Sequence, residues 1–476
     1  MLLALKKVYT VTKKQERPRI WLYELICEAA GFKPGDELFI ASDQSNQQIT
    51  IKNVPIGSAD DKVHVSSRKN ETSGKLRPIV DTAKESYRSI IDIKQKIEIS
   101  VYRDGAESMV VVQPLKFQMF EKEIMVRPND ERITTFTICS GAGYVSAAFQ
   151  DTGYFSSVGA VELEEDSAAV YNFNFPSTFL FNGNLLDCST VAKADVAIVT
   201  LPCNEFSSLG NAEGGVFNNL SLAATDLIRA TQCRTIFFEN VPSFYKTDAY
   251  LSMKELLKND FLYWQEENIE ALDFGSIARR NRTYAVAFRH REDFLNFQFP
   301  KPPKNIRRKK LREYLDGKNV QHAWKPLEKW MKSFSEKVEK GNSWKDRSLT
   351  KTFVDRDATE IQCIPKRYTG QSASSTYLLS EDKQSFRFFS IDEIRRILSV
   401  PDWFEYPDYI GKIRQYEMIG QSVDCRIIKS IANTLATMWY KVKCIGGGDD
   451  CSIQVRNEIH DTAITLEKSG QFGFIF

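Results

Sequence analysis

Cys203 is the residue in this sequence whose setting best suits covalent chemistry. It follows the apolar run at residues 194–199 and Pro202, and it opens a polar stretch that ends near Gly210. A thiol at the end of such a strand lies at the sheet edge where open α/β folds bind ligands. There it acts as a nucleophile when a neighbouring cation or dipole favours the thiolate, although most single cysteines are small buried apolar residues.

An acid and two arginines follow other apolar runs. Glu239 ends the segment Phe237-Phe238 and is flanked by apolar residues, a setting that suits a proton donor but equally a carboxylate that caps the next loop. Arg280 and Arg282 alternate at the start of a further strand, so both side chains are expected on one face. They suit the binding of a carbonyl or a phosphate, and surface ion pairs are the simpler alternative.

A glycine-rich turn and a distant acid predict a cofactor site. Ser140, Gly141 and Gly143 follow the first apolar run, where backbone amides can approach a ligand closely. Glu162 ends the next apolar run, about 20 residues on, where a carboxylate can accept hydrogen bonds from both ribose hydroxyls of an adenosine group. Each feature alone is common in α/β proteins, and the pair favours an adenosine-containing ligand.

Strands and helices alternate from Thr134 onward and must position these residues. Apolar runs predict strands at residues 135–139, 157–163, 194–201, 234–240 and 283–288, with helices at 144–152 and 167–173. This alternation predicts an α/β fold with a doubly wound, Rossmann-like parallel sheet. A helix-rich piece is expected at 390–440.

Residues 1–127 have a different texture, with short alternating segments typical of paired strands. Arg17-Pro18 and the strands after it are echoed by Arg77-Pro78 and its following strands, which predicts a small β-rich domain of two related halves. It resembles the swapped-hairpin barrels of AbrB-like and SymE-like DNA binders. We expect it to fold independently of the core and to add DNA affinity or pair two subunits.

The segment after Lys301 carries most of the charge asymmetry of the chain. The whole sequence has a net charge of +2, yet residues 301–370 hold 19 Lys and Arg against 9 Asp and Glu. Such a local excess suits a phosphate backbone, and a solvated basic loop is the alternative. We expect DNA contacts from Lys309, Lys310 and Arg312 within this segment.

Taken in order, these segments resemble the motifs of the DNA cytosine-5 methyltransferase family. The motifs are the SGxG turn, the Asn184 loop, PCxxFSxxG from Pro202, ENV from Glu239, RxR from Arg280, and two later segments at 387–404 and 419–423. The resemblance covers roughly residues 134–290 and 386–440. It implies an S-adenosylmethionine-dependent methyltransferase core, residues 128–300 and 386–445, a target-recognition insertion at 301–385, and a C-terminal tail at 446–476.

The resemblance also implies roles for individual residues. Cys203 adds to C6 of a cytosine flipped out of double-stranded DNA, Glu239 protonates N3, and Arg280 and Arg282 hold the base and the loop. S-adenosylmethionine then methylates C5, and no metal is expected. The implied cofactor contacts are Ser140, Gly141, Gly143, Glu162, Asn184, Pro202 and Ser422.

Several positions depart from the family pattern. The family usually has an acid at Thr137, Phe at Cys139, Gly at Tyr144, Asp at Asn184, Gln or Ser at Asn204, Gln at Ala278 and Asn at Gln421. Most of these positions line the cofactor pocket in the family. Two alternatives therefore stay open: a cytosine-5 methyltransferase that acts on RNA, and a non-catalytic DNA-binding protein on a methyltransferase scaffold.

Cysteine usage and hydropathy set the remaining limits. Nine scattered cysteines and four histidines, without a CxxC pair, argue against a disulfide framework or a zinc site. No apolar run approaches the length of a membrane span, and the N-terminus lacks a signal peptide pattern. We expect a cytoplasmic protein of bacterial or phage origin, and whether a restriction endonuclease accompanies it stays open.

Overall fold

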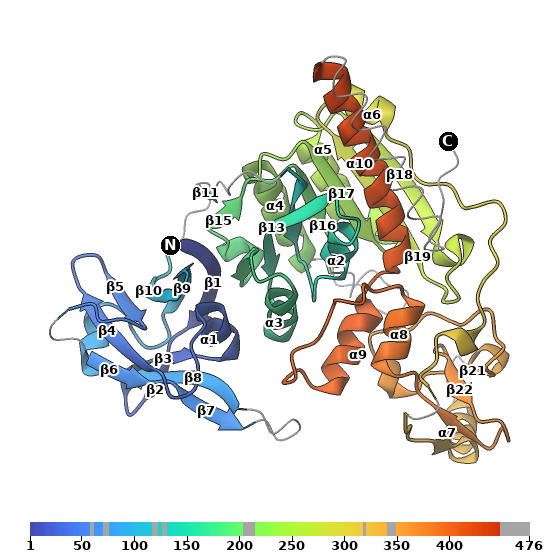
Figure 1. The fold of residues 1–476 in the computed structure, drawn as a ribbon, viewed down its shortest axis with the longest axis horizontal. Helices are drawn as coiled ribbons and strands as arrows, with labels where there is room; N and C mark the ends of the chain where they lie inside the picture. The colour runs from blue at the N-terminus through green and yellow to red at the C-terminus, as the bar shows by residue number, and fades with distance from the viewer. Residues whose placement is uncertain are drawn as a thin grey trace.

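The computed structural model shows an N-terminal unit at residues 1–127, a central core, and a separate region at residues 301–385, seen from left to lower right in Figure 1. We call the last of these the recognition region after its predicted role. It describes residues 1–57, 61–69, 76–116, 122–125, 131–202, 215–317, 320–339 and 349–447. Cys203 and Asn204 lie outside these described residues, as do most of the predicted tail 446–476. None of the described helices is long and apolar enough to cross a membrane.

The core is built on a mixed sheet with the order β14-β13-β12-β16-β17-β19-β18. Its parallel strands are β12 (Ile133–Ile138), β13 (Phe155–Glu162), β14 (Phe179–Asn182), β16 (Val196–Val199) and β17 (Thr235–Asn240). They are buried on both faces, which explains their continuous apolar sequences. An antiparallel hairpin, β18 (Tyr263–Glu270) and β19 (Asn281–Phe288), completes one side. The predicted α/β core is confirmed, with this hairpin as an antiparallel addition.

Helices cover the core sheet on both faces. They are α2 (Tyr144–Gln150), α3 (Glu165–Asn174), α4 (Gly215–Ala230), α5 (Asp248–Leu257), α6 (Arg291–Asn296) and α10 (Cys425–Gly447). The long helix α10 packs against α2 and α6, so the chain returns to the core after the recognition region. Two further helices, α8 (Ile391–Ile397) and α9 (Lys412–Gln421), lie between that region and α10. The predicted helix-rich piece at 390–440 is confirmed.

The N-terminal unit reproduces the sequence repeat in its strand pairing. β3 (Arg17–Leu22) pairs with β8 (Leu76–Ala83), and β5 (Gln48–Lys52) pairs with β10 (Glu107–Pro114). Each pair joins equivalent strands of the two halves. The other elements are β2 (Thr12–Lys14), α1 (Glu24–Ala30), β4 (Glu37–Asp43), β6 (Asp61–His64), β7 (Ser66–Lys69) and β9 (Lys96–Asp104).

Strand β1 (Leu2–Thr10) connects the N-terminal unit to the core. It pairs antiparallel with β9 on one side and parallel with β14 on the other, so a single 13-stranded sheet runs through both parts. The methyltransferase motifs begin only at Thr134, which predicts a core sheet that is complete without residues 1–127, but the sheet continues through β1. The reason is that β14 would otherwise be an edge strand with unpaired backbone groups, and β1 pairs with them. Independent folding of the N-terminal residues stays a prediction.

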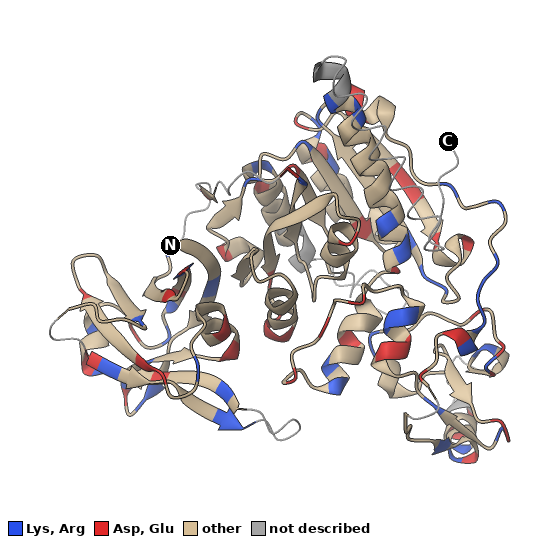
Figure 2. Cartoon of the chain, in the orientation of Figure 1, with Lys and Arg blue, Asp and Glu red and all other residues tan. Residues whose placement is uncertain are grey.

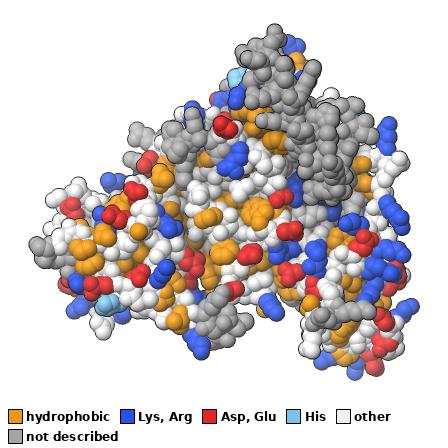
Figure 3. Space-filling view, viewed as in Figure 1, with side chains coloured by type: hydrophobic (Ala, Val, Ile, Leu, Met, Phe, Trp, Pro, Cys, Tyr) orange, Lys and Arg blue, Asp and Glu red, His pale blue; other side chains and the backbone are white. Residues whose placement is uncertain are grey.

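The recognition region contains a small sheet with the order β20-β23-β22-β21. Its strands are β20 (Lys325–Pro326), β21 (Phe353–Val354), β22 (Tyr377–Leu379) and β23 (Ser385–Arg387), and α7 (Leu327–Glu339) accompanies them. Aromatic side chains hold it together, because Phe353 contacts the rings of Trp330, Tyr377 and Phe386. Lys and Arg residues follow the extended chain that leads into this region (Figure 2), and they gather on the right of the surface in Figure 3.

Candidate active site

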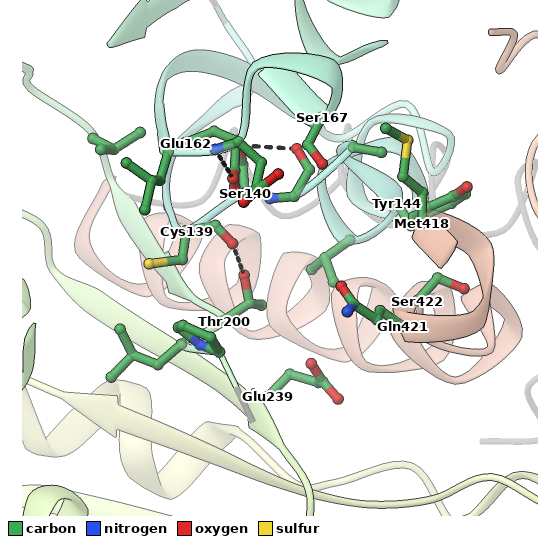
Figure 4. Close-up of a pocket in the computed structure, with 18 of the residues that line it drawn as sticks. Cys139, Ser140, Tyr144, Glu162, Ser167, Thr200, Glu239, Met418, Gln421 and Ser422 are labelled. Atoms are coloured by element: carbon green, nitrogen blue, oxygen red, sulfur yellow. Dashed lines mark hydrogen bonds between the residues drawn. The ribbon is translucent and has the colours of Figure 1, made fainter. Parts of the chain in front are cut away.

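A cavity of about 400 Å³ lies at the carboxyl ends of the parallel strands. The strand order reverses at β12, which has β13 on one side and β16 on the other. Such a reversal leaves a crevice at the strand ends where open α/β folds bind ligands. The ends of five strands and the residues after them line it: 139–142 with 144–145, 161–164, 183–185, 200–202 and 239–241. Figure 4 shows Glu162 and Ser140 at one end of the cavity and Glu239 at the other.

The glycine turn depends on left-handed backbone conformations. Cys139, Gly141 and Gly143 have φ angles of 57°, 55° and 99°. A Cβ atom on Gly143 would lie 2.8 Å from carbon atoms of both Tyr171 and Phe175, so only glycine fits at this position. Ser140 and Gly141 line the cavity, whereas Gly143 supports the turn from behind.

Glu162 is held by the backbone of this turn and of its own strand end. Gly141 N–H donates to Oε2 at 2.7 Å, and Glu164 N–H donates to Oε1 at 2.8 Å. Burial raises the pKa of Glu162, and these backbone hydrogen bonds oppose that rise. Each carboxylate oxygen retains a second lone pair, so the side chain can accept hydrogen bonds from a vicinal diol.

Glu239 and Arg282 form an ion pair at the other end of the cavity. Arg282 Nε lies 3.2 Å from Glu239 Oε1, and both side chains line the cavity. Burial raises the pKa of Glu239, while Arg282 and then Arg280 partly oppose the shift. A carboxyl group with a raised pKa beside a cation suits proton donation to a ring nitrogen.

Arg280 lies away from the cavity lining. Its guanidinium is almost completely buried, with 2% of the residue exposed, and donates to the backbone carbonyls of Ile364 at 3.2 Å and Gly420 at 3.0 Å. It also donates to the carbonyl of Ser422. The two arginines predicted to share a face therefore have different surroundings, because Arg280 connects the recognition region to the segment after α9.

The end of α9 and the residue after it form the third wall of the cavity. Met418, Gln421 and Ser422 line this wall, and Ser422 is one of the residues predicted to contact the cofactor. Arg414 on α9 pairs with Glu164 and Asp166 at the start of α3, at 2.8 Å in each case. Sequence reasoning missed Arg414, because its partners lie about 250 residues away in the chain and no motif marks it.

Asn184 and Pro202, which are also predicted to contact the cofactor, line the cavity. The Asn184 side chain accepts a hydrogen bond from Leu186 N–H at 3.0 Å, which fixes the start of the turn after β14. Pro202 is the residue before Cys203, so the chain leaves the described part of the structure at the cavity wall. The position of the Cys203 thiol stays a prediction.

Two departures from the family pattern are compensated by local contacts. Thr137 hydrogen-bonds the Ser146 hydroxyl at 2.9 Å, and Tyr171 donates to the same hydroxyl at 3.3 Å, so neutral hydroxyl groups fill the space beneath the turn. Tyr144 stacks on Phe404 with ring centroids 4.8 Å apart. Both residues therefore take part in packing around the glycine turn.

The basic residues predicted to contact DNA lie on the surface of the recognition region. Lys309 is exposed, and Lys310 and Arg312 both pair with Asp357, at 2.9 Å for Lys310. Nearby, Glu360 pairs with Arg279 at 2.6 Å and Lys351 at 3.0 Å. Cations outnumber acids in both clusters, which leaves a positive surface next to strand β19.

One group of side chains in the described part of the chain has metal-binding chemistry: Asp316, His322 and Glu393. Both carboxylates already have arginine partners, since Arg396 lies 2.5 Å from Asp316 and Arg387 lies 2.6 Å from Glu393. The group lies outside the cavity lining, and its ion pairs fix α8 to the recognition region.

Comparison with known proteins identifies the family. The sequence matches the family described as C-5 cytosine-specific DNA methylase over residues 133–437, which span the cavity and the recognition region. The chain belongs to the C-5 cytosine-specific DNA methylases. Membership of this family implies S-adenosylmethionine as the methyl donor.

Type II methyltransferases are among the similar proteins. M.Bsp6I of Bacillus sp. (strain RFL6) is 30% identical over 174 residues, which cover 35% of this chain and 55% of that protein. M.MspI of Moraxella sp. is 22% identical over 307 residues, 62% of this chain and 69% of that protein. The Entamoeba histolytica methyltransferase EhMeth shares the fold, with a TM-score of 0.50 and 18% identity over 64% of this chain and 98% of the other.

Proposed function

We propose that this C-5 cytosine-specific DNA methylase transfers a methyl group to C5 of a cytosine that has been flipped out of double-stranded DNA. One observation carries the proposal: the ion-paired acid Glu239 and the carboxylate Glu162 with its glycine turn open into the same cavity. A proton donor and an adenosyl-binding group thus face a shared space. This is the arrangement needed to activate a base next to a methyl donor.

The reaction divides among a few side chains. The Cys203 thiolate adds to C6 of cytosine while Glu239 donates its proton to N3, so that negative charge does not accumulate on the ring. Arg282 donates to the carbonyl oxygen of the base and keeps Glu239 oriented. After C5 has gained the methyl group, a base removes the C5 proton, the Cys203 thiolate leaves C6, and the N3 proton returns to Glu239, which restores the neutral aromatic ring.

The cavity fits S-adenosylmethionine, which supplies an electrophilic methyl group when bound. Glu162 would accept the ribose hydroxyls, Ser140 and Gly141 would approach the ligand through the backbone, and Asn184, Pro202 and Ser422 would complete the walls. Gly143 would act indirectly by permitting the turn. We assign Arg280 a positioning role, because its hydrogen bonds go to backbone carbonyls of two other segments.

We take double-stranded DNA as the substrate because the matched family is described as a DNA methylase and the recognition region offers a basic surface to a phosphate backbone. RNA is the alternative, since the same surface would also attract its phosphates. A non-catalytic scaffold is the weaker alternative, because Glu162, Glu239 and Arg282 all retain the chemistry of a working site. By analogy with the type II relatives, a restriction endonuclease is a candidate partner, and a cytoplasmic setting in a bacterium or phage-infected cell follows. DNA binding by the N-terminal unit remains a prediction.

Covalent trapping tests the proposal directly. A fluorine at C5 of cytosine prevents the final proton loss, so the protein should remain attached to 5-fluorocytosine DNA in the presence of S-adenosylmethionine. Cys203→Ala should abolish the complex, and Glu239→Gln should slow its formation by about 100-fold or more. Glu267→Gln, which changes an exposed acid on β18, two strands away from Glu239, is the matched control and should trap normally. Normal trapping by Cys203→Ala would refute the mechanism.

A further inference from the structure

Lys7 on strand β1 carries a buried ammonium group from the N-terminal unit into the core. Only 5% of the residue is exposed, and Nζ donates to Asn182 Oδ1 at 2.7 Å. Nζ also lies 3.1 Å from a carboxylate oxygen of Glu165, at the start of α3. Tyr23, from the same unit, donates to Asn182 Oδ1 at 3.3 Å. Two side chains of the N-terminal unit thus converge on one amide of the core.

Asn182 links these side chains to the end of the cavity where Glu162 lies. It is completely buried, and its Nδ2 donates to the backbone carbonyls of Glu162 at 2.8 Å and Leu163 at 3.2 Å. These carbonyls belong to the strand end that presents the Glu162 carboxylate. The residues after Asn182, Gly183 and Asn184, line the cavity themselves. One side chain therefore separates the Lys7 ammonium from two segments of the cavity wall.

The N-terminal unit also holds the opposite wall. Tyr409, just before α9, donates its hydroxyl to Glu28 of α1 at 2.7 Å. Arg77 donates to the Tyr409 carbonyl at 3.3 Å and stands over the Tyr409 ring, 5.3 Å from its centroid. Helix α9 then supplies Met418 and Gln421 to the cavity. Helix α1 also packs beside α3 (Figure 1). The unit therefore contacts segments that lead to both walls of this end of the cavity.

The cost of burying Lys7 indicates that its contact is specific. An ammonium group in the interior is unfavourable unless hydrogen bonds and charges compensate for lost hydration, and an apolar residue would pack on β1 more cheaply. The neighbouring Lys6 is equally buried but points the other way, where it pairs with Glu98 at 3.1 Å and Glu123 at 3.2 Å. Lys6 thus pairs with acids of the neighbouring strands, whereas Lys7 contacts the strand end next to the cavity.

We propose that the N-terminal unit is part of the cofactor site, with Lys7 and Tyr409 as positioning residues that hold the two walls for S-adenosylmethionine. The inference rests on the proposed function, since it takes this cavity to be the cofactor site. Neither residue touches the ligand. Their effect is to fix the backbone of Glu162 and the start of α9, so their loss should weaken cofactor binding more than DNA binding.

Calorimetric titration of the full chain with S-adenosylmethionine tests this. Lys7→Met removes the ammonium and keeps the apolar stem, and it should weaken binding by roughly five- to tenfold, as expected for loss of a charged hydrogen bond at a buried site. Lys6→Met removes an equally buried ammonium from the same strand and should leave the dissociation constant unchanged. Tyr409→Phe keeps the ring under Arg77, removes only the bond to Glu28, and should weaken binding about threefold.

The outcomes separate the inference from the proposed function. If the unmodified chain fails to bind S-adenosylmethionine, the cofactor assignment itself fails. If it binds, and Lys7→Met and Tyr409→Phe bind equally well, the positioning role is overturned. Thermal unfolding of each variant identifies a protein that no longer folds, and if Lys7→Met does not fold, Tyr409→Phe decides alone. DNA affinity, measured in parallel, should stay within twofold of the unmodified chain, and a selective loss of DNA binding would also overturn the inference.

Discussion

At the scale of single residues, two buried carboxyl groups have different tasks because their partners differ. Glu162 is bound by backbone N–H groups of the glycine turn and the strand end, whereas Glu239 is bound by the side chain of Arg282. Burial raises the pKa of both groups. The backbone partners keep Glu162 an acceptor, and the cationic partner of Glu239 sets how readily it gives up its proton.

The titration of Glu239 predicts the pH dependence of the rate. Only the protonated form can donate to N3, so kcat should be sustained below the raised pKa of Glu239 and fall as pH increases through it. Arg282 lowers this pKa, so Arg282→Gln should reduce kcat and move the descending limb to higher pH. A pH series of single-turnover methylation at saturating DNA measures both effects. A limb that stays in place, or moves to lower pH, contradicts the role of Arg282.

Residue-level predictions from the sequence succeeded where a strand end dictates position. Glu162 and Glu239 end parallel strands, and the ends of such strands meet at one edge of a sheet, so their place at one cavity could be predicted. Lys7 could not be predicted, because its partner Asn182 is 175 residues away and only the pairing of β1 with β14 brings them together. The sequence alone also does not distinguish a lysine that becomes buried from one that stays exposed to solvent.

At the scale of elements, the wall formed by α9 depends on close backbone packing. A Cβ atom on Gly420 would lie 2.3 Å from the carbonyl oxygen of Pro365 in the recognition region. Gly420→Ala should therefore destabilise the fold by about 1–3 kcal/mol and weaken cofactor binding as the wall shifts. Gly411→Ala, at the start of the same helix with open space around it, should cost less than about 1 kcal/mol. Equal melting temperatures for the two variants would contradict the packing argument.

Element predictions failed where sequence periodicity is weak. Strand β14 has only four residues, all buried, which is too short for a helix or strand period to appear. Strand β18 is rich in polar and acidic residues because it lies at the edge of the sheet, so its sequence lacks the apolar run that marked the other strands. Tertiary position, which the sequence does not state, determined both elements.

At the scale of the whole molecule, the positive surface of the recognition region predicts a salt-sensitive interaction with DNA. Changing Lys309, Lys310 and Arg312 together to uncharged residues should weaken binding and reduce the slope of log affinity against log salt by about two. The reduction should be below three, because Asp357 already offsets part of this charge. Changing Arg229, Lys254 and Lys258, which pair with acids on α5, on β18 and in the turn between them, is the control. An unchanged slope for the first set would remove it from the DNA interface.

Whole-molecule organisation was only partly accessible from the sequence. The repeat that begins at Arg17 and Arg77 predicted two related halves, and the strands that follow pair as equivalents. The continuous sheet through β1 was not foreseen, because pairing between distant strands leaves no local signal. Methyltransferase motifs begin only after Thr134, which made the core look complete by itself.

The parallel pairing of β1 with β14 has a consequence for folding during synthesis on the ribosome. At a synthesis rate of about 5–20 residues per second, roughly 9–35 s pass between the emergence of Lys7 and that of Asn182 175 residues later. During that interval β1 can pair only with β9, along almost its whole length. Strand β1, already paired with β9, would then be in place when β14 emerges, so a strand made much earlier would set the register of the last parallel strand on that side of the core.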